Sequence, residues 1–441
     1  MTSCCSDAAP GARPDTDGRR KAGGGEPRRK PVFGPGLAGC LLGAALLAPL
    51  GVTFLAPFGG GALAQTLTVT LQSCATGLAR PAPVLPDCRT EAPGLQIRDP
   101  EFSGQSFRAV WQTDTTVALA RVNPFTGAIR TETVVEAPVR PAPIGLTGNG
   151  PEWAFSQRGT EVFFTCETET GALELCRLTQ SRGGAAVSIL PGSEGRALSN
   201  PSRNPDSLRP KLYWKGFAPT GPGGTLEKSG FGWREDSRTP DDVAMPEGSQ
   251  IGVWLPDASG LLLQANVLVD GRVTRQLFLY DTATETAVPL LDDALSRRGA
   301  VPWAAPELGG ATAVAAFVDR PEGRILETYR MDPDGVWTLW SAIPPICPGY
   351  PAGDSVEPFV FEGRSYLSLA SYAGSGDETR DPGIVWIASA DPDLPPEERV
   401  RRLVSSADCT ADALNRRDPE TLVLAPGSGA RVYFVTAGLA E

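Results

Sequence analysis

Histidine is missing from the sequence, and acidic residues outnumber basic ones, with 51 Asp and Glu against 40 Lys and Arg. Without histidine, the chain can form no Ser-His-Asp or Cys-His catalytic group and no histidine-bound metal site. The net charge of −11 leaves no basic surplus to neutralise phosphates, which excludes a nucleic-acid partner. Also absent are a phosphate-binding glycine loop before a helix and a Gly-x-Ser-x-Gly elbow.

Glycine and proline are abundant, with 50 and 42 residues respectively in a chain of 441. Such a composition does not suit a helical bundle, because both residues interrupt helices and favour turns. It is typical of many short strands joined by turns. The sequence therefore predicts an all-β fold.

Residues 1–64 have the organisation of a secretory signal peptide with a long basic n-region. Residues 1–30 are polar and basic, residues 32–58 are apolar, and Ala62-Leu63-Ala64 forms an A-x-A cleavage site before Gln65. We therefore expect a periplasmic or secreted protein whose mature form, residues 65–441, is one domain that does not span a membrane. An uncleaved membrane anchor is the alternative.

The type of signal stays open between three possibilities. General secretion is the simplest. Arg28-Arg29 also allows a twin-arginine signal, and Leu37-Ala38-Gly39-Cys40 resembles a lipoprotein cleavage box, although it precedes most of the apolar run.

Six cysteines remain after the leader, and an even number in an exported chain indicates disulfides. The segments that end at Cys166 and Cys176 are typical of two strands around a turn, which could place these cysteines opposite each other. We predict three disulfides, which are Cys74–Cys88, Cys166–Cys176 and Cys347–Cys409. Six free buried thiols are the alternative.

A repeat of roughly fifty residues runs through the mature chain. Each unit begins with an acidic or proline-containing segment followed by a strand pair, and a second strand pair follows about 25 residues later. The units begin at Arg98, Asn149, Asn200, Ser249, Ala304, Ser355 and Arg416. In the third unit, residues 217–233 are rich in glycine and poorly periodic, and there we expect a loop insertion.

Two hairpins per unit at this spacing predict the four-stranded blades of a β-propeller. Seven blades are the preferred count, and six are the alternative. The last unit has only two strands, whereas the segment from Gln65 supplies strand sequence without an entry motif. We therefore expect the N-terminal strands to complete the last blade and to close the ring.

Two units resemble the repeat of TolB-type, WD-repeat-like propellers, which is similar to Pro-x-Trp-Ser-Pro-Asp-Gly followed by an apolar strand. The matching residues are Trp153, Phe155, Ser156 and Gly159 in one unit and Trp254, Pro256, Asp257 and Gly260 in the other. The resemblance covers about two of seven units and implies the fold. It implies little about a ligand. The tryptophans themselves we interpret as packing between blades.

Carboxylates recur where the units begin, and in a propeller these positions lie near the central channel. The candidates for a site are Asp99, Glu101, Glu152, Glu307 and Glu357, and Asp206, Asp418 and Glu420 occupy similar positions. Converging carboxylates shift one another's pKa and can perform acid–base chemistry on a glycosidic bond. Alternatively, each carboxylate accepts hydrogen bonds from backbone amides in a turn.

No cofactor and no metal site is predicted, although structural calcium is an option at two acidic turns. These contain Asp332, Asp334 and Gly335 in one case and Asp391, Asp393, Glu397 and Glu398 in the other. We expect a non-catalytic module that binds or scaffolds a protein or a glycan partner. The alternative is a carbohydrate-active enzyme, similar to glycoside hydrolases, that uses the carboxylates of the channel.

Overall fold

The computed structural model describes residues 69–438 apart from short gaps between and within its elements. The gaps are 79–86, 93–96, 114, 137–139, 142–150, 157–158, 169–170, 182–183, 194–197, 206–210, 221–224, 236–240, 243–248, 322, 344–346, 348–351, 374–380 and 405–413. The chain divides into two units, Met1–Leu63 and Ala64–Glu441, and the described residues belong to the second. The predicted signal peptide lies outside them.

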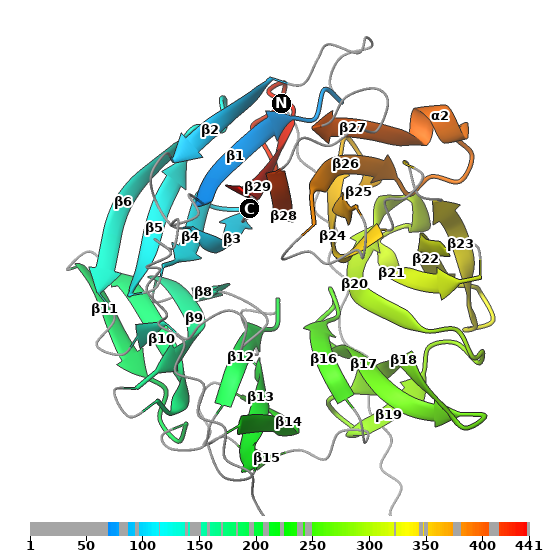
Figure 1. Cartoon of the computed structure of the whole chain (residues 1–441), viewed down its shortest axis with the longest axis horizontal. Helices are drawn as coiled ribbons and strands as arrows, with labels where there is room; N and C mark the ends of the chain where they lie inside the picture. The colour runs from blue at the N-terminus through cyan, green and yellow to red at the C-terminus, as the bar shows by residue number, and fades with distance from the viewer. Residues whose placement is uncertain are drawn as a thin grey trace, which may run out of the picture. The chain divides into compact units, whose positions relative to one another are not determined.

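The described residues form seven antiparallel sheets, which we number in chain order from the sheet that contains Arg98, so that the sheet with both the first and the last described strands is sheet 7 (Figure 1). Sheet 1 contains β3 (Arg98–Ser103), β4 (Arg108–Gln112), β5 (Thr116–Val122) and β6 (Ile129–Glu136). Sheet 2 contains β7 (Arg140–Pro141), β8 (Glu152–Ser156), β9 (Gly159–Glu167), β10 (Leu173–Ser181) and β11 (Gly184–Ile189). Sheet 3 contains β12 (Leu198–Arg203), β13 (Lys211–Thr220), β14 (Thr225–Glu235) and β15 (Asp241–Asp242).

The remaining sheets repeat this plan. Sheet 4 contains β16 (Ser249–Trp254), β17 (Gly260–Val269), β18 (Arg272–Asp281) and β19 (Thr286–Pro289). Sheet 5 contains β20 (Arg297–Ala305), β21 (Ala311–Arg320), β22 (Gly323–Met331) and β23 (Trp337–Ile343). Sheet 6 contains β24 (Ala352–Phe361), β25 (Arg364–Tyr372), β26 (Gly383–Ser389) and β27 (Val400–Val404). Sheet 7 has the order β28 (Leu414–Val423), β29 (Ala430–Gly438), β1 (Val69–Ala75) and β2 (Cys88–Ala92).

Helices are almost absent from the described residues. A single 3-10 turn, η1 (Pro306–Leu308), follows β20, and α2 (Pro396–Arg399) is one turn long. No helix in this part of the chain has the length and apolar character to cross a membrane. The predicted all-β fold is confirmed.

Burial explains why the middle strands of the sheets are apolar on both faces, whereas residues of the outer strands alternate between more buried and more exposed positions. β26 is buried at every residue, and β11 alternates between exposed and half-buried positions. Middle strands lie between two neighbouring sheets, so both of their faces are covered. Two-residue turns connect some hairpins, such as Asp270-Gly271 and Glu362-Gly363, in which both residues have positive φ.

Seven buried apolar clusters form the core, and each joins two sheets. The pairs are sheets 1 and 2, 2 and 3, 3 and 4, 4 and 5, 5 and 6, 6 and 7, and 7 and 1. Trp111 and Trp386 are fully buried in two of these clusters, as expected for packing between sheets. Each sheet is therefore covered by its neighbours in chain order, and sheet 7 also packs against sheet 1.

The expected loop insertion over residues 217–233 is wrong. β13 and β14 extend through this segment as a hairpin whose pairing runs from Lys211 opposite Glu235 to Thr220 opposite Thr225. A register shift between Gly216 and Phe217 accommodates the irregular sequence. Glycine lowers strand propensity, but cross-strand pairing along the whole hairpin overrides it.

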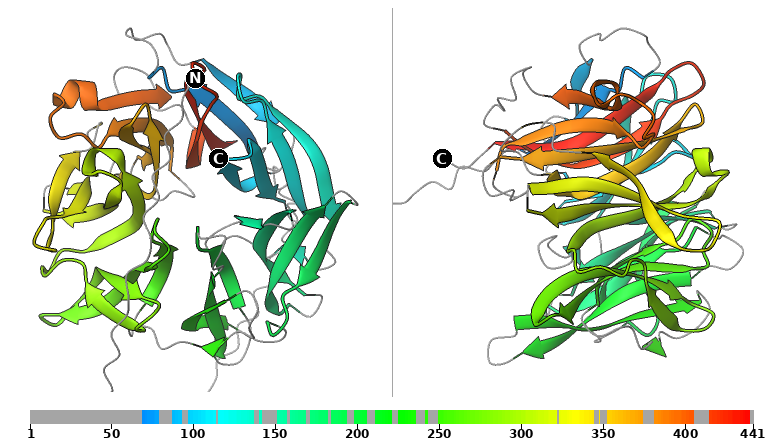
Figure 2. Two further views of the ribbon diagram at one scale, coloured as in Figure 1. Left: turned by 180° about the vertical axis from the view of Figure 1, so that it is seen from behind. Right: turned by 90° about the vertical axis from the view of Figure 1, so that its right-hand side faces the viewer.

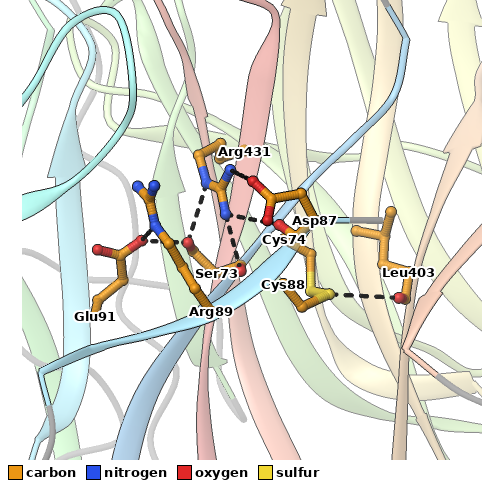
Figure 3. Close-up of a disulfide and its surroundings, with 8 residues drawn as sticks. All are labelled: Ser73, Cys74, Asp87, Cys88, Arg89, Glu91, Leu403 and Arg431. Carbon is orange, nitrogen blue, oxygen red and sulfur yellow. Dashed lines mark hydrogen bonds and ion pairs between the residues drawn. A yellow bond between two sulfur atoms is a disulfide. The ribbon is translucent and has the colours of Figure 1, made fainter. Parts of the chain in front are cut away.

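Sheet 7 combines the first and last strands of the described chain. β1 pairs with β29 along its whole length, and Figure 2 shows these blue and red strands side by side. Arg431 on β29 is buried and donates hydrogen bonds to the Ser73 side chain and carbonyl and to the Asp87 carbonyl, at 3.1, 3.1 and 2.8 Å. Ser73 also donates a hydrogen bond to Glu91, which pairs with Arg89 at 2.6 Å (Figure 3).

Two of the predicted disulfides are present. Cys74 and Cys88 lie directly opposite each other on β1 and β2 and are bonded. Cys166 is bonded to Cys176, but the expectation that the two are opposite is wrong, because Cys166 faces Glu174 in the register and Cys176 lies two residues further on. Residues two apart share a face of a strand, so this diagonal pair is still within reach.

The third predicted pair is only partly covered by the described residues. Cys347 is disulfide-bonded. Its predicted partner Cys409 lies outside the described residues, so the pairing stays a prediction.

Candidate functional site

The first strands of the sheets share an irregularity that the sequence displays twice in identical form. Arg98-Asp99-Pro100-Glu101 on β3 and Arg417-Asp418-Pro419-Glu420 on β28 are the same tetrapeptide. In both, the register shifts between the arginine and the glutamate, and the aspartate has a positive φ of 46° or 49°. A bulge of this kind bends the strand and re-aims the residues beside it. Strained backbone at non-glycine residues is typical of functional positions.

Six carboxylates from four first strands influence one another, and we call them the carboxylate cluster. They are Asp99 and Glu101 on β3, Glu152 on β8, Glu357 on β24, and Asp418 and Glu420 on β28. The four strands belong to sheets 6, 7, 1 and 2, and apolar clusters join sheet 6 to 7, sheet 7 to 1 and sheet 1 to 2. Of the sequence candidates, the structure therefore brings together Asp99, Glu101, Glu152 and Glu357.

Burial and like charge raise the pKa values of the cluster. The pKa of Glu101 lies well above its ordinary value, chiefly through burial and then through Glu420 and Glu152. The pKa of Glu420 is raised similarly, with Glu357 as the largest charged contributor after burial. Burial, followed by Glu152 and Asp418, raises the pKa of Glu357 to about 8. At neutral pH the carboxyl group of Glu357 is therefore held largely protonated.

Basic partners are scarce around the cluster. Within the described part of the chain, no cation forms an ion pair with Glu101, Glu357 or Glu420. Asp418 lies 3.8 Å from Arg417 Nε, and burial still raises its pKa above the ordinary value. Glu101, Glu357 and Glu420 thus lie among like charges without an ion pair of their own in this part of the chain.

A serine hydroxyl holds two of the cluster strands side by side. Ser368 Oγ lies within hydrogen-bond distance of the Glu357 and Pro419 carbonyl oxygens, at 3.2 and 3.3 Å, and accepts a bond from Thr421 at 2.8 Å. Ser368 is fully buried. The polar network therefore sets the backbones of β24 and β28 at a fixed spacing, which fixes Glu357 relative to Glu420.

Glu307 does not belong to the cluster, which corrects the sequence hypothesis. It lies in η1, and its carboxylate accepts hydrogen bonds from the Ser365 backbone N–H and from Ser365 Oγ, the latter at 2.7 Å. Glu307 thus joins sheet 5 to sheet 6. It accepts a backbone amide hydrogen bond, as the structural alternative to a catalytic role predicts. Asp206 lies outside the described residues.

A cavity of about 620 Å³ opens along the first strands of the other sheets. Trp153 on β8, Trp254 on β16 and Trp303 on β20 line it, together with Ser202, Arg203 and Asn204 at and beyond the end of β12. Glu152 also lines this cavity, so it belongs to both the cavity and the carboxylate cluster. Together the two features use the first strands of all seven sheets.

The tryptophans of the cavity are fixed by their indole N–H groups. Trp153 donates to the Glu101 carbonyl at 3.2 Å, and Trp254 donates to the Ser202 carbonyl at 2.9 Å. Trp303 donates to Ser365 Oγ at 3.0 Å. Each bond crosses to a neighbouring sheet. Because the N–H groups are already bonded within the protein, the rings offer only carbon surface to the cavity.

In the two acidic turns considered for calcium, an aspartate side chain accepts hydrogen bonds from backbone amides of the same turn. Asp332 accepts hydrogen bonds from the Asp334 and Val336 amides at 3.0 and 2.8 Å, and Asp391 accepts one from the Asp393 amide at 3.0 Å. Such contacts are those of Asx turns. Across the described ranges, no group of three or more Asp, Glu, Cys or His side chains is arranged to hold a metal ion.

Sequence reasoning missed the polar part of the cavity, formed by Ser202, Arg203 and Asn204. It also treated the tryptophans only as packing residues. A usable signal existed, because Trp153 and Trp254 fall in the first strand of their repeat units, and Trp303 directly precedes Ala304, where the fifth predicted unit begins. Residues that recur at the innermost strand of a propeller repeat line its centre.

Comparisons with known proteins return only distant similarities. No protein-family model matches the chain, and no curated protein matches it. A protein described as a TolB candidate from Agrobacterium tumefaciens has a TM-score of 0.44 at 11% identity, with coverage of 85% of this chain and 100% of that one. TolB from Acinetobacter baumannii has a TM-score of 0.38 at 15% identity, with coverage of 63% of this chain and 64% of that one.

A sialidase from Trypanosoma rangeli in complex with sialic acid has a TM-score of 0.37 at 11% identity, with coverage of 78% of this chain and 59% of that chain. Similarities at this level carry no argument about what the present chain binds or catalyses.

Proposed function

We propose that this chain is an exported β-propeller of seven four-stranded blades and that it works as a non-catalytic binding module for a protein or glycan. The seven sheets, the apolar cluster between each sheet and the next, and the cluster between sheets 7 and 1 support the blade count. The pairing of β1 with β29 supports a ring that is closed between N-terminal and C-terminal strands.

Disulfides support export of residues 65–441 after removal of the signal peptide 1–64. Cys74–Cys88 and Cys166–Cys176 are bonded, and such bonds form and persist in oxidising compartments such as the periplasm or the cell exterior. The type of signal stays open.

The observation that carries the binding function is the carboxylate cluster together with its shared residue Glu152 in the cavity. Carboxylates from four sheets meet there, and like charge adds to burial in raising the pKa values of Glu101, Glu357 and Glu420. Groups arranged at a cost to stability are expected at a site that a ligand completes. A cavity of about 620 Å³ lies within the size range of ligand sites.

One observation favours a second candidate, a glycoside hydrolase. The pKa of Glu357 is raised to about 8, with Glu152 as the largest charged cause after burial. A carboxyl group that stays protonated near neutral pH meets the needs of a general acid, and Glu152 is a neighbouring carboxyl group that would serve as its partner.

Paired assays on the full chain separate these functions. Wild type, Glu101→Gln, Glu357→Gln and the exposed control Glu285→Gln are tested for binding on glycan and peptide arrays, and for release of chromophore from aryl glycosides. The binding module is supported by binding without turnover, if the affinity falls at least tenfold in Glu101→Gln, whether or not it also falls in Glu357→Gln. Turnover that Glu357→Gln abolishes and Glu285→Gln retains overturns it in favour of the hydrolase. Binding that all three variants retain rejects the carboxylate cluster as the site.

A further inference from the structure

The two disulfides whose cysteines both belong to the described residues differ in their access to solvent. Cys166 and Cys176, on the middle strands β9 and β10 of sheet 2, are both fully buried. In the other bond Cys74 is fully buried, whereas Cys88 is exposed, with the Leu403 carbonyl oxygen 3.8 Å from its Sγ. Thiol–disulfide exchange requires that a thiolate reach one of the two sulfur atoms. Of these two bonds, Cys74–Cys88 is the one that offers such a sulfur atom.

The position of Cys88 in the fold adds to this access. Cys88 is the first residue of β2, and β2 forms one end of sheet 7. The terminal residues of an edge strand open locally at a low free-energy cost, because neighbouring strands cover them on one side only. β9 and β10, in contrast, lie between other strands of sheet 2. Local opening therefore exposes the Cys74–Cys88 bond more readily than the Cys166–Cys176 bond.

The beginning of β2 is held in place by the disulfide and by contacts of Asp87 (Figure 3). Arg431 donates a hydrogen bond to the Asp87 carbonyl at 2.8 Å, and the Ala75 amide donates to the same oxygen at 3.2 Å. Arg431 also lies 3.3 Å from the Asp87 carboxylate, whose side chain is 77% exposed, so solvent screens this ion pair. The disulfide is the covalent member of this set, and its loss loosens this end of the strand.

The other end of β2 is held separately by sheet 1. Arg89 donates a hydrogen bond to the Thr126 carbonyl at 2.8 Å, and the Ile129 amide donates to the Glu91 carboxylate at 3.2 Å. These contacts do not depend on the disulfide. Opening of the bond therefore frees the beginning of β2 while the rest of the strand stays attached.

We propose that Cys74–Cys88 is an exchange site for dithiols and acts as a redox-sensitive clasp on the beginning of β2. A thiolate of the dithiol attacks Cys88 Sγ, the Cys74–Cys88 bond breaks, and its electron pair leaves on Cys74 Sγ, which takes up a proton from water. The second thiol of the reductant then attacks the mixed disulfide, Cys88 leaves and is protonated, and the dithiol is oxidised to its own disulfide. The neutral Cys74 thiol suits its apolar cluster, because a free cysteine packs as a small apolar residue.

The register of the two cysteines explains why the reductant is a dithiol. Cys74 and Cys88 lie directly opposite each other on β1 and β2. After attack by a monothiol, the freed Cys74 is therefore placed to attack the mixed disulfide and to expel the monothiol again. A dithiol overcomes this reversal because its second thiol is already tethered to the mixed disulfide.

Timed reduction of the folded full chain with dithiothreitol tests the proposal. Samples are quenched with acid, the denatured chain is alkylated with N-ethylmaleimide, and each cysteine is assigned by peptide mass spectrometry. Without urea, Cys74 and Cys88 are expected to open about tenfold faster than Cys166 and Cys176, and in urea this difference should disappear. Equal rates without urea, or earlier opening of Cys166–Cys176, overturn the proposal.

The sulfur atom that is attacked is identified with the monothiol 2-mercaptoethanol, whose adduct stays on that atom. The expected product has the adduct on Cys88 and N-ethylmaleimide on Cys74. An adduct chiefly on Cys74 overturns the assignment of Cys88. Reduction by 2-mercaptoethanol that is as complete as reduction by dithiothreitol, at the same thiol concentration, overturns the preference for dithiols.

A third reductant distinguishes a small dithiol from a protein dithiol. A thioredoxin-type protein with a Cys-x-x-Cys motif is used at the same dithiol concentration as dithiothreitol. Faster opening of Cys74–Cys88 by the protein supports a protein reductant, and slower opening supports a small one. Failure of both reductants to open the bond before the chain unfolds refutes the exchange site.

Backbone amide hydrogen exchange, measured by mass spectrometry, tests the clasp. Selective reduction is expected to accelerate exchange by about tenfold in the peptide that contains Cys88 and Arg89, and to leave β9 and β10 unchanged. The double variant Cys74→Ser, Cys88→Ser should show the same acceleration without reductant. If this variant does not fold, the reduced wild type alone decides the result. Unchanged exchange around Cys88 after reduction refutes the clasp.

Discussion

Neutralising Glu357 should stabilise the protein at alkaline pH and leave it unchanged in acid. Glutamine has the shape of a protonated glutamate and cannot ionise. Glu357 lies among like charges, and burial followed by Glu152 and Asp418 raises its pKa to about 8 from an ordinary value of 4.5. The Glu357→Gln variant therefore removes a charge that the folded state tolerates poorly.

The expected size follows from the two pKa values. The unfolded chain releases the Glu357 proton near pH 4.5, whereas the folded chain releases it near pH 8. The contribution of this proton to the free energy of unfolding is therefore fully present below pH 4.5 and is lost as the pH rises to about 8. At about 1.4 kcal/mol per tenfold change, the full difference is roughly 5 kcal/mol. Since the side chain is half-buried and solvent screens part of the interaction, we expect about 2–3 kcal/mol.

Urea denaturation under non-reducing conditions at pH 4 and pH 9 measures this effect. Glu357→Gln should match wild type at pH 4 and exceed its free energy of unfolding by roughly 2–3 kcal/mol at pH 9. Glu285→Gln, in an exposed turn, should show no such difference between the two pH values. A Glu357→Gln variant that is less stable than wild type at pH 9, or equally shifted at both pH values, refutes the electrostatic account of the cluster.

Three other perturbations are expected to lower the free energy of unfolding. Replacing Arg431 by Met removes its bonds across sheet 7 and should cost about 2–4 kcal/mol by urea denaturation; a cost below about 1 kcal/mol contradicts its role. The change Gly260→Ala places a Cβ 2.0 Å from the Tyr280 carbonyl oxygen and should cost more than about 3 kcal/mol, whereas Gly104→Ala, with its nearest contact at 3.8 Å, should be near neutral in the same thermal melts. Cys166→Ser opens a disulfide that spans 10 residues and should cost roughly 2–3 kcal/mol by urea denaturation under non-reducing conditions, and an unchanged free energy of unfolding contradicts its stabilising role.

The repeat units predicted the architecture well because strand pairing is local. Units that begin at Arg98, Ser249 and Ser355 correspond to β3, β16 and β24, whereas the unit predicted to begin at Ala304 starts only at the end of β20. Each hairpin is specified by turn residues and alternation within a short segment, so a single sequence contains the needed information.

Convergence of the carboxylates was partly predictable, and the failure at Glu307 has a structural cause. The sequence comparison aligned the Pro-Glu dipeptides of the units. In the structure the common landmark is the bulge, which shifts the register between Arg98 and Glu101 on β3 and between Arg298 and Val301 on β20. Val301 is therefore the counterpart of Glu101, and Glu307 lies beyond the strand. Bulges depend on pairing with the next strand, and the Arg-Asp-Pro-Glu sequence that accompanies two of them is absent from β20.

The composition of sheet 7 also affects the order in which the protein can fold. During synthesis β1 emerges first among the described strands, but its pairing partner β29 follows more than three hundred residues later in the chain. The edge of β1 that faces β29 must stay unpaired while the other sheets are made, and this exposed edge is open to pairing with foreign strands. The Cys74–Cys88 bond can join β1 to β2 during this interval, so that a preformed hairpin, and not a single loose strand, awaits β29. Assembly of the last sheet is thus a late, long-range event, which slows folding and makes the protein dependent on protection until its final strands arrive.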